Sequence, residues 1–142
     1  MSKKLRKMKS FEQVKVDLLG RMIDPKRKEN NALLCGDREI SYGELDKESC
    51  RYGNALKTFG VKNRDRVLML VRDTPEFFYF YLGLMRIGAI PVALNYRLTS
   101  ADIAFIIKNS ESNIFVLEDC FKEIFLDSIK ISNSKIDSII LD

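Results

Sequence analysis

The chain has 142 residues, a formal net charge of +4, 46% hydrophobic residues and no histidine. This length and apolar content suit one domain with its own core, which excludes a disordered tail and a disulfide-stapled miniprotein. The absence of histidine excludes Ser-His-Asp and Cys-His catalytic pairs, histidine-ligated zinc or haem, and a histidine pH switch. Any chemistry must therefore use carboxylates, lysines, arginines, hydroxyls, thiols or backbone amides.

The positive charge is concentrated at the N-terminus. Residues 1–28 contain ten Lys/Arg and three Asp/Glu, whereas residues 29–142 contain fourteen Lys/Arg and seventeen Asp/Glu. Residues 1–10 are therefore predicted to be a basic tail. The body is mildly acidic and carries no recognition motif, so no nucleic-acid partner is expected. No signal-peptide core follows the tail, and Arg86 interrupts the longest apolar run, 77–90, so we expect a cytoplasmic protein without a transmembrane segment.

The cysteines do not predict a metal site. Cys35, Cys50 and Cys120 are odd in number, and their spacing matches neither zinc-ligand pairs nor a disulfide framework. We expect them to be free, buried thiols of a protein in a reducing compartment.

The first part of the chain predicts a helix followed by a hairpin. Apolar residues on one face favour a helix over 11–23, and Asp24-Pro25 ends it because proline disfavours helix in the residue before it. A charged linker spans 26–31. Strands over 32–35 and 38–41 flank a Gly-Asp pair, which is typical of a β-hairpin with a tight turn.

A second helix follows the hairpin directly. Ser41 and Glu44 have the spacing of a capping box, and Gly60 is a good left-handed terminator. The helix between them carries an apolar stripe formed by Leu45, Tyr52, Leu56 and Phe59.

From residue 67 onward, apolar strands alternate with helices. Apolar runs predict strands over 67–71, 90–94, 113–117 and 136–141. Periodicity and capping signals predict helices over 77–87, from Thr99 with Asp102, and over 121–129. Strands that are apolar on both faces favour a parallel sheet with flanking helices, so the fold class is α/β. The last strand ends with the chain and has no covering helix, so we expect the domain to be incomplete.

Ligands of an open parallel sheet bind at the carboxyl ends of its strands, here 72–75, 95–99 and 118–120. None of these segments is a glycine-rich phosphate loop. Gly83 and Gly88 fit helix packing and a helix end instead. No catalytic residue and no metal ligand is therefore assigned.

Three charged groups at these strand ends have more than one interpretation. Glu118-Asp119 could form a metal-binding or phospho-acceptor pair like that of response-regulator receivers. Receivers also need acids after an earlier strand, where only Asp73 is present, and Asp73 fits a helix cap. Arg72 fits a solvated charge at a strand end. Arg97 could bind a phosphate through bidentate hydrogen bonds, or it could be a loop arginine without a ligand.

Several short motifs occur in order along residues 31–120. They are Ile40-Ser41-Tyr42-Gly43-Glu44-Leu45, Asn54-Ala55-Leu56, Phe59-Gly60-Val61, Asp65-Arg66-Val67, Asp73-Thr74-Pro75-Glu76-Phe77, Arg86-Ile87-Gly88-Ala89-Ile90-Pro91-Val92, Asn95 and Arg97-Leu98-Thr99. Each is weak alone, but the ordered set resembles the N-terminal portion of the adenylate-forming, or AMP-binding, acyl-CoA synthetase superfamily. The Asp-Thr-Pro-Glu-Phe run is most similar to the benzoate-CoA, or aryl-CoA, ligase branch.

This resemblance implies a two-step reaction in a parent enzyme that uses ATP, Mg²⁺ and coenzyme A. A carboxylate attacks the α-phosphate of ATP to give an acyl-adenylate and pyrophosphate, and the thiol of coenzyme A then displaces AMP. Residues 11–142 would be the N-terminal part of the synthetase large domain, and the remainder of that chain would be their partner. The family's Pro-Lys-Gly phosphate loop and Thr-Gly-Asp motif do not occur here. We therefore expect this chain alone to be inactive and to hold no cofactor tightly.

One binding residue follows from the resemblance. Arg97, in Asn95-Tyr96-Arg97-Leu98, matches an arginine that in some of these ligases lies near the nucleotide phosphate of coenzyme A. The alternative to a ligase fragment is a self-standing α/β module that binds a partner or a phosphorylated ligand without catalysis. A fragment would leave apolar surface exposed, so we expect it to self-associate.

Overall fold

The computed structural model describes residues 24–141. The basic tail predicted over 1–10 and the helix predicted over 11–23 lie outside this described part. The chain divides into two compact units, Met1–Asp46 and Lys47–Asp142. Each unit is described separately below.

The first unit contains a short helical turn, a hairpin and the start of a helix. The elements are η1 (Pro25–Arg27), β1 (Asn31–Cys35), β2 (Arg38–Ser41) and the first turn of α2 (Tyr42–Phe59). The backbone N–H of Lys26 donates to Asp24 Oδ1 at 3.0 Å, so the predicted linker begins with a capped 3₁₀ turn. The antiparallel pairing of β1 and β2 confirms the hairpin. Gly36 has a φ of +58° in its turn, which glycine adopts without strain.

The serine contact of the capping box predicted for the second helix is present. The backbone N–H of Glu44 donates to Ser41 Oγ at 3.1 Å, which satisfies one of the free N–H groups at the start of α2. The helix ends at Phe59, before Gly60 with a φ of +107°, as predicted. Phe59, the last residue of the predicted apolar stripe, lies in the last turn and is 48% exposed.

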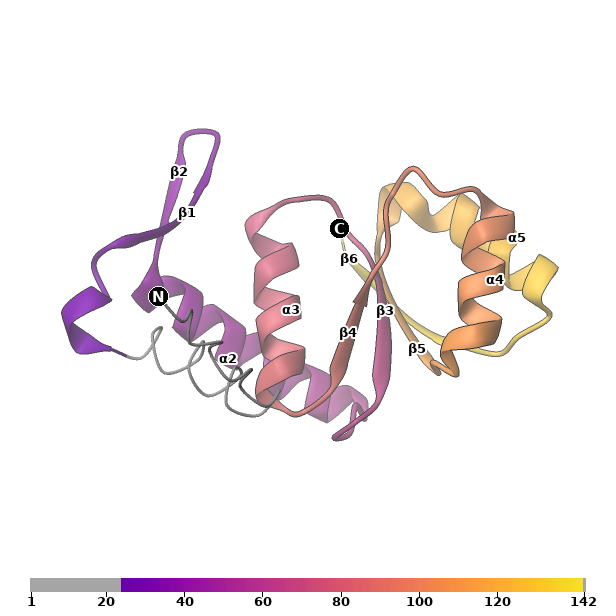
Figure 1. Ribbon diagram of the computed structural model, residues 1–142, viewed down its shortest axis with the longest axis horizontal. Coiled ribbons are helices and arrows are strands. Elements are labelled where there is room, and N and C mark those ends of the chain that lie inside the picture. Colours follow the sequence, from indigo (N-terminus) through magenta and orange to yellow (C-terminus); the bar gives the residue numbers. More distant parts are fainter. Residues whose placement is uncertain (1–23, 142) are drawn as a thin grey trace, which may run out of the picture. The chain divides into compact units, whose positions relative to one another are not determined.

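The second unit is a parallel α/β sheet, which confirms the predicted fold class. Its strands are β3 (Arg66–Leu70), β4 (Ile90–Ala93), β5 (Ile114–Glu118) and β6 (Asp137–Leu141). Its helices besides α2 are α3 (Pro75–Arg86), α4 (Ser100–Ser110), η2 (Asp119–Phe121) and α5 (Lys122–Ser132). The strand order is β4-β3-β5-β6 with all pairs parallel, so β3 and β5 are the central strands (Figure 1).

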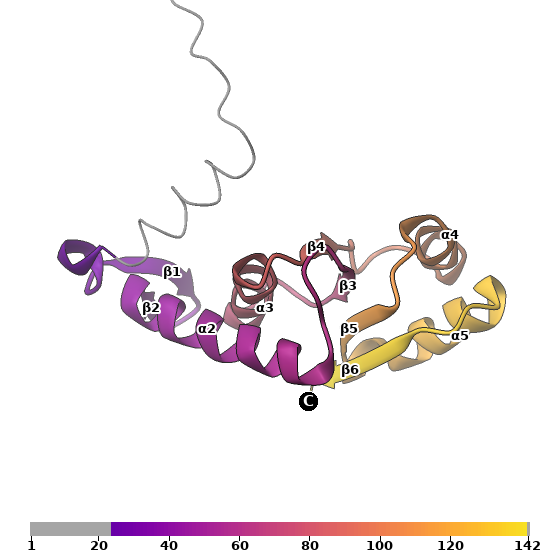
Figure 2. The same ribbon diagram turned by 90° about the horizontal axis from the view of Figure 1, so that it is seen from below.

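One face of this sheet is covered by α3 and by the part of α2 that belongs to the second unit (Figure 2). Val67 and Met69 of β3 pack there against Leu56 of α2 and against Phe80 and Leu84 of α3. All five side chains are at most 5% exposed, so their burial supplies much of the hydrophobic stabilisation of this unit.

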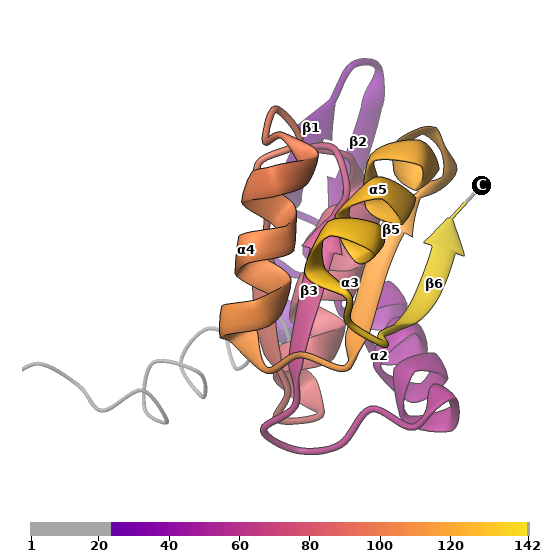
Figure 3. The same ribbon diagram turned by 90° about the vertical axis from the view of Figure 1, so that its right-hand side faces the viewer.

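The opposite face is covered by α4 and α5, which lie over β3 and β5 in Figure 3. Leu68 and Leu70 of β3 point to this side, where they pack with Ile103 of α4 and Phe125 of α5. Successive residues of a strand point to opposite faces. The uninterrupted apolar run in β3 therefore reflects a strand that is buried on both sides.

The start of α3 corrects one sequence prediction. Asp73 was expected to cap this helix, but Thr74 is its N-cap residue, and the Thr74 side chain makes no capping hydrogen bond. The reason is that Pro75 takes the first helical position, so the N-cap position falls on the residue directly before it. The predicted helix end at Gly88 is confirmed by its φ of +82°.

The cysteines are free, as predicted, but the prediction that they are buried is wrong. Cys50 and Cys120 are exposed and Cys35 is partly exposed. Cys50 lies beside the fully buried Ser49 on α2, and the helical turn points the two side chains in different directions. Within residues 24–141, no helix is long and apolar enough to cross a membrane.

The capping box predicted for α4 is complete. Thr99 Oγ1 accepts from the backbone N–H of Asp102 at 3.3 Å, and Asp102 Oδ2 accepts from the Thr99 backbone N–H at 3.0 Å. Asp102 Oδ2 also accepts from the Thr99 hydroxyl at 2.6 Å. These bonds to Thr99 lower the pKa of Asp102 below its ordinary value of 3.8.

Replacing Asp102 with asparagine is expected to lower stability in a pH-dependent way. Because the folded-state pKa is lowered, the stabilisation is complete above the unfolded value of 3.8 and is lost as the pH falls through the lower folded value. Thermal unfolding of the wild type and of Asp102→Asn, followed from neutral pH to pH about 2, checks this. The two melting temperatures should converge in acid, and a constant difference would contradict the assignment.

Candidate functional site

The loops at the carboxyl ends of β3, β4 and β5 carry the polar side chains singled out in the sequence. Arg72 follows β3, the segment 95–98 follows β4, and Glu118 ends β5. The backbone N–H of Leu94 donates to the carbonyl of Met69 at 2.8 Å, so the loop after β4 leaves the sheet directly beside β3. This edge is where ligands of open α/β sheets bind.

Arg97 lies on a tight turn whose backbone is held at both ends. Its backbone N–H donates to Asn95 Oδ1 at 2.9 Å, which is an Asx turn, and the N–H of Leu98 donates to the Asn95 carbonyl at 3.1 Å. Thr99 then begins the capping box of α4. The Arg97 side chain is exposed, and among residues 24–141 no carboxylate lies within ion-pair distance of it.

Two aromatic rings accompany Arg97. The Tyr96 ring stacks on the Phe121 ring with a centroid distance of 6.4 Å and an interplanar angle of 22°. Arg97 Cζ lies over the Tyr96 ring, 5.9 Å from its centroid. Phe121 belongs to η2, which follows β5, so this contact joins the loop after β4 to the loop after β5.

Arg72 and Glu118 form an ion pair across the ends of β3 and β5. Arg72 Nε lies 2.6 Å from Glu118 Oε2, and the Arg72 backbone N–H donates to Glu118 Oε1, also at 2.6 Å. This hydrogen bond to the carboxylate raises the pKa of Arg72 above its ordinary value. Arg72 is an exposed charge at a strand end, as predicted, and it is also paired with Glu118.

The Arg72–Glu118 ion pair also bears on the interpretation of Glu118-Asp119 as a metal-binding or phospho-acceptor pair. Both Glu118 oxygens already accept hydrogen bonds from Arg72. Within the described range 24–141, no group of three or more His, Cys, Asp or Glu side chains could hold a metal ion. The observed role of Glu118 is to link two neighbouring strand ends.

A hollow of about 300 Å³ lies next to this ion pair. Its lining comes from the ends of β3, β5 and β6 and from the start of α3, and consists of Val71, Arg72, Thr74, Glu76, Glu118, Asp119, Cys120 and Leu141. Arg97 is not part of this lining, so the edge has two separate regions. One region is the hollow, where Arg72 is paired with Glu118. The other is the exposed Arg97 guanidinium over the Tyr96 ring.

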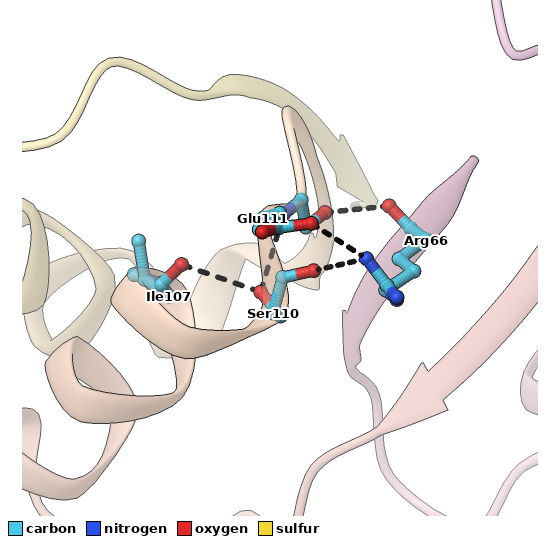
Figure 4. A network of polar contacts seen from close by, with 5 residues as sticks. Arg66, Ile107, Ser110 and Glu111 are labelled. Atoms are coloured by element: carbon cyan, nitrogen blue, oxygen red, sulfur yellow. Dashed lines mark hydrogen bonds and ion pairs between the residues drawn. The ribbon is translucent and has the colours of Figure 1, made fainter.

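At the amino ends of the strands, opposite the candidate site, a polar network connects β3 to the turn between α4 and β5 (Figure 4). One guanidinium nitrogen of Arg66 donates to the carbonyl of Ser110 and to Glu111 Oε2, both at 3.2 Å. The hydroxyl of Ser112 donates to the Arg66 carbonyl at 2.6 Å. These bonds fix the backbone at the amino ends of the strands.

Sequence reasoning selected Arg97 but missed the Tyr96–Phe121 stacking and the Arg72–Glu118 pair. Both contacts join residues that follow different strands, and they require β4, β3 and β5 to lie side by side. The polar residue directly after each apolar run was the only available signal for the ion pair.

Comparison with known proteins agrees with this fold. The sequence profile of the family described as AMP-binding enzyme matches residues 24–141. Over 125 residues the chain is 38% identical to the 3-hydroxybenzoate–CoA/4-hydroxybenzoate–CoA ligase of Thauera aromatica. This alignment covers 88% of this chain and 24% of that ligase. Over 94 residues it is 42% identical to the 3-hydroxybenzoate–CoA ligase of Aromatoleum sp. (strain CIB), covering 66% and 18% of the two chains.

Solved structures show the same arrangement. The anthranilate CoA ligase AuaEII in complex with anthranoyl-AMP superposes with a TM-score of 0.79 and 26% identity over 89% of this chain and 24% of that one. A benzoate CoA ligase from Burkholderia xenovorans LB400 shares the fold with a TM-score of 0.79 at 23% identity, over 90% and 26% of the chains. The chain thus spans about a quarter of the length of these ligases. It belongs to the AMP-binding enzyme family and corresponds to the N-terminal portion of its acyl-CoA ligases, with aromatic-acid ligases among its relatives.

Proposed function

We propose that residues 11–142 form the N-terminal part of the large domain of an AMP-forming carboxylate–CoA ligase, with residues 1–10 as a basic tail. This proposal rests on the family match over residues 24–141 and on the parallel sheet that the chain shares with a solved ligase structure. In the parent ligase, a carboxylate would react with ATP to give an acyl-adenylate, and coenzyme A would then take the acyl group as a thioester. "Parent ligase" here means a longer chain that contains these residues.

We further propose that the carboxylate is aromatic. The support is that relatives at 38% and 42% identity are named as hydroxybenzoate–CoA ligases. The test is thioester formation by the parent ligase with ATP, Mg²⁺, coenzyme A and matched panels of hydroxybenzoates and aliphatic acids. Faster turnover of the hydroxybenzoates is expected, and a preference for aliphatic acids would refute the aromatic assignment.

The role proposed for this chain is to form one wall of the site and to contribute Arg97. The Arg97 guanidinium has the chemistry to bind a phosphate of coenzyme A, because it is exposed, positively charged and a fork of hydrogen-bond donors. Arg72 is less suited, since Glu118 already neutralises it. The residues that assist ATP and Mg²⁺ in the first step are expected in the remainder of the parent chain.

Replacing Arg97 with alanine is expected to raise the KM for coenzyme A about tenfold in the parent ligase, because a charge-assisted hydrogen bond to phosphate is lost. The KM values for ATP and for the carboxylate should stay unchanged. Arg72→Ala is the matched control, since it removes an arginine from the same edge. An unchanged KM for coenzyme A in Arg97→Ala would remove Arg97 from the binding site.

We also propose that the isolated chain self-associates through its sheet edges. Ile90 on the edge strand β4 and Ile140 on the edge strand β6 are 42% and 40% exposed. Exposed apolar side chains on open edge strands favour association with further strands. Light scattering should show oligomers of the isolated chain, and a monodisperse monomer would contradict the proposal.

A further inference from the structure

The Arg97 side chain poses a physical problem at its site. Hydrogen bonds from the Asn95 turn fix the backbone at Arg97, but an exposed arginine side chain keeps several rotatable bonds. Ordering such a side chain on a ligand reduces its conformational entropy, which weakens binding. A group that orients the guanidinium before binding would therefore strengthen the capture of phosphate.

Tyr96 has the geometry of such a group. The Arg97 guanidinium carbon lies 5.9 Å from the Tyr96 ring centroid, within the range of cation–π attraction. The Tyr96 ring itself stacks on Phe121 at 6.4 Å, and this contact restricts its rotation. Tyr96 is 41% exposed, so hydrophobic burial alone does not account for an aromatic residue here.

The two arginines of this edge show why an aromatic ring suits the task. Glu118 holds Arg72 at 2.6 Å and cancels its charge. The face of Tyr96 attracts the Arg97 guanidinium but accepts none of its N–H groups in conventional hydrogen bonds, so the charge and the donor fork stay available to an anion.

We infer that Tyr96, supported by Phe121, is a positioning residue that orients the Arg97 guanidinium toward a phosphate of coenzyme A. This inference rests on the binding role proposed for Arg97. Tyr96 acts through Arg97 and does not itself contact coenzyme A. The stacked pair also ties the loop after β4 to η2 after β5, so the position of Arg97 depends on both strands.

The first test measures the orientation of Arg97 in the 142-residue chain by NMR. The ring current of Tyr96 should shift the Arg97 side-chain proton resonances away from their random-coil positions. Tyr96→Leu should return them to those positions, Phe121→Leu should move them in the same direction, and Tyr96→Phe should retain the shift. Phe105→Leu is the matched control, because Phe105 is a 67% exposed aromatic residue on α4. Random-coil resonances in the wild type would overturn the inference.

The second test measures the KM for coenzyme A in the parent ligase. Tyr96→Leu is expected to raise it about two- to fivefold, the effect of losing an exposed cation–π contact, with kcat and the KM for ATP unchanged. Tyr96→Phe should restore the wild-type value. In an Arg97→Ala background, Tyr96→Leu should have no further effect, since Tyr96 acts through Arg97.

The outcomes separate the inference from the proposal on which it rests. If Arg97→Ala raises the KM for coenzyme A and Tyr96→Leu does not, the positioning role fails and the binding role of Arg97 stands. If Tyr96→Leu still raises the KM in the Arg97→Ala background, Tyr96 contacts coenzyme A directly and the inference is wrong. If Arg97→Ala itself has no effect, the proposed binding role has failed.

Discussion

Replacing Phe115 with alanine is expected to lower the free energy of unfolding by about 3 to 5 kcal/mol. Phe115 lies on the central strand β5, its side chain is 0% exposed, and its ring packs edge-to-face on Phe125 of α5 at 4.9 Å. The substitution removes the transfer energy of the ring and leaves a cavity between the sheet and α5. Denaturant unfolding of the chain measures the change.

The matched control for this prediction is Phe105→Ala, because Phe105 is 67% exposed on α4. An exposed substitution away from special contacts changes stability by about 0.5 kcal/mol at most. Similar losses in the two variants would contradict the core position of Phe115. Because β5 also ends in Glu118 and continues into η2, loosening it should disturb the candidate site as well.

Replacing Gly83 with alanine is expected to destabilise the chain by about 1 to 3 kcal/mol. An added Cβ on Gly83 of α3 would lie 2.9 Å from the Gly53 backbone nitrogen and 3.1 Å from the Ser49 carbonyl oxygen, both on α2. These are backbone atoms, so no rotamer change relieves the clash, and the two helices must move apart. This outweighs the higher helix propensity of alanine.

Asn54→Ala is the control for the helix crossing. Asn54 follows Gly53 on α2 and is exposed, so alanine there changes helix propensity without touching α3. A small stabilisation of at most about 0.7 kcal/mol is expected. If thermal unfolding shows that Gly83→Ala is also stabilising, the close approach of α2 and α3 is refuted.

The sheet could be predicted from the sequence because its strands are apolar on both faces. The runs that became β3 and β5 are bounded by polar residues, and the helices between them carry readable end signals such as Gly88 and the Thr99–Asp102 box. These signals depend only on residues that are close in the sequence, so they can be recognised without knowledge of the tertiary fold.

Contacts between loops could not be predicted in the same way. The Arg72–Glu118 pair is separated by 46 positions, and it forms because β5 lies next to β3 although β4 comes between them in the sequence. The stacking of Tyr96 on Phe121 likewise depends on the strand order. The exposure of Cys50 and Cys120 was missed because composition does not tell which side of an element faces solvent.

These observations agree with the part proposed for the chain in its family. The strands β4, β3 and β5 lie side by side in the sheet. Their carboxyl ends carry Arg72, which is paired with Glu118, and the exposed Arg97. Among the described residues no group of side chains is arranged for metal binding. In the proposed parent ligase, this chain would shape the site and bind, and the chemistry is assigned to the remaining residues.

Pyrophosphate release tests most directly whether these residues are one part of a carboxylate–CoA ligase. The assay compares the isolated chain and the parent ligase in the presence of ATP, Mg²⁺ and 3-hydroxybenzoate. The parent ligase is expected to release pyrophosphate and, with coenzyme A, to form the thioester, while the isolated chain stays at the level of a no-protein control. Turnover by the isolated chain, or none by a folded parent ligase with any carboxylate, would contradict this assignment.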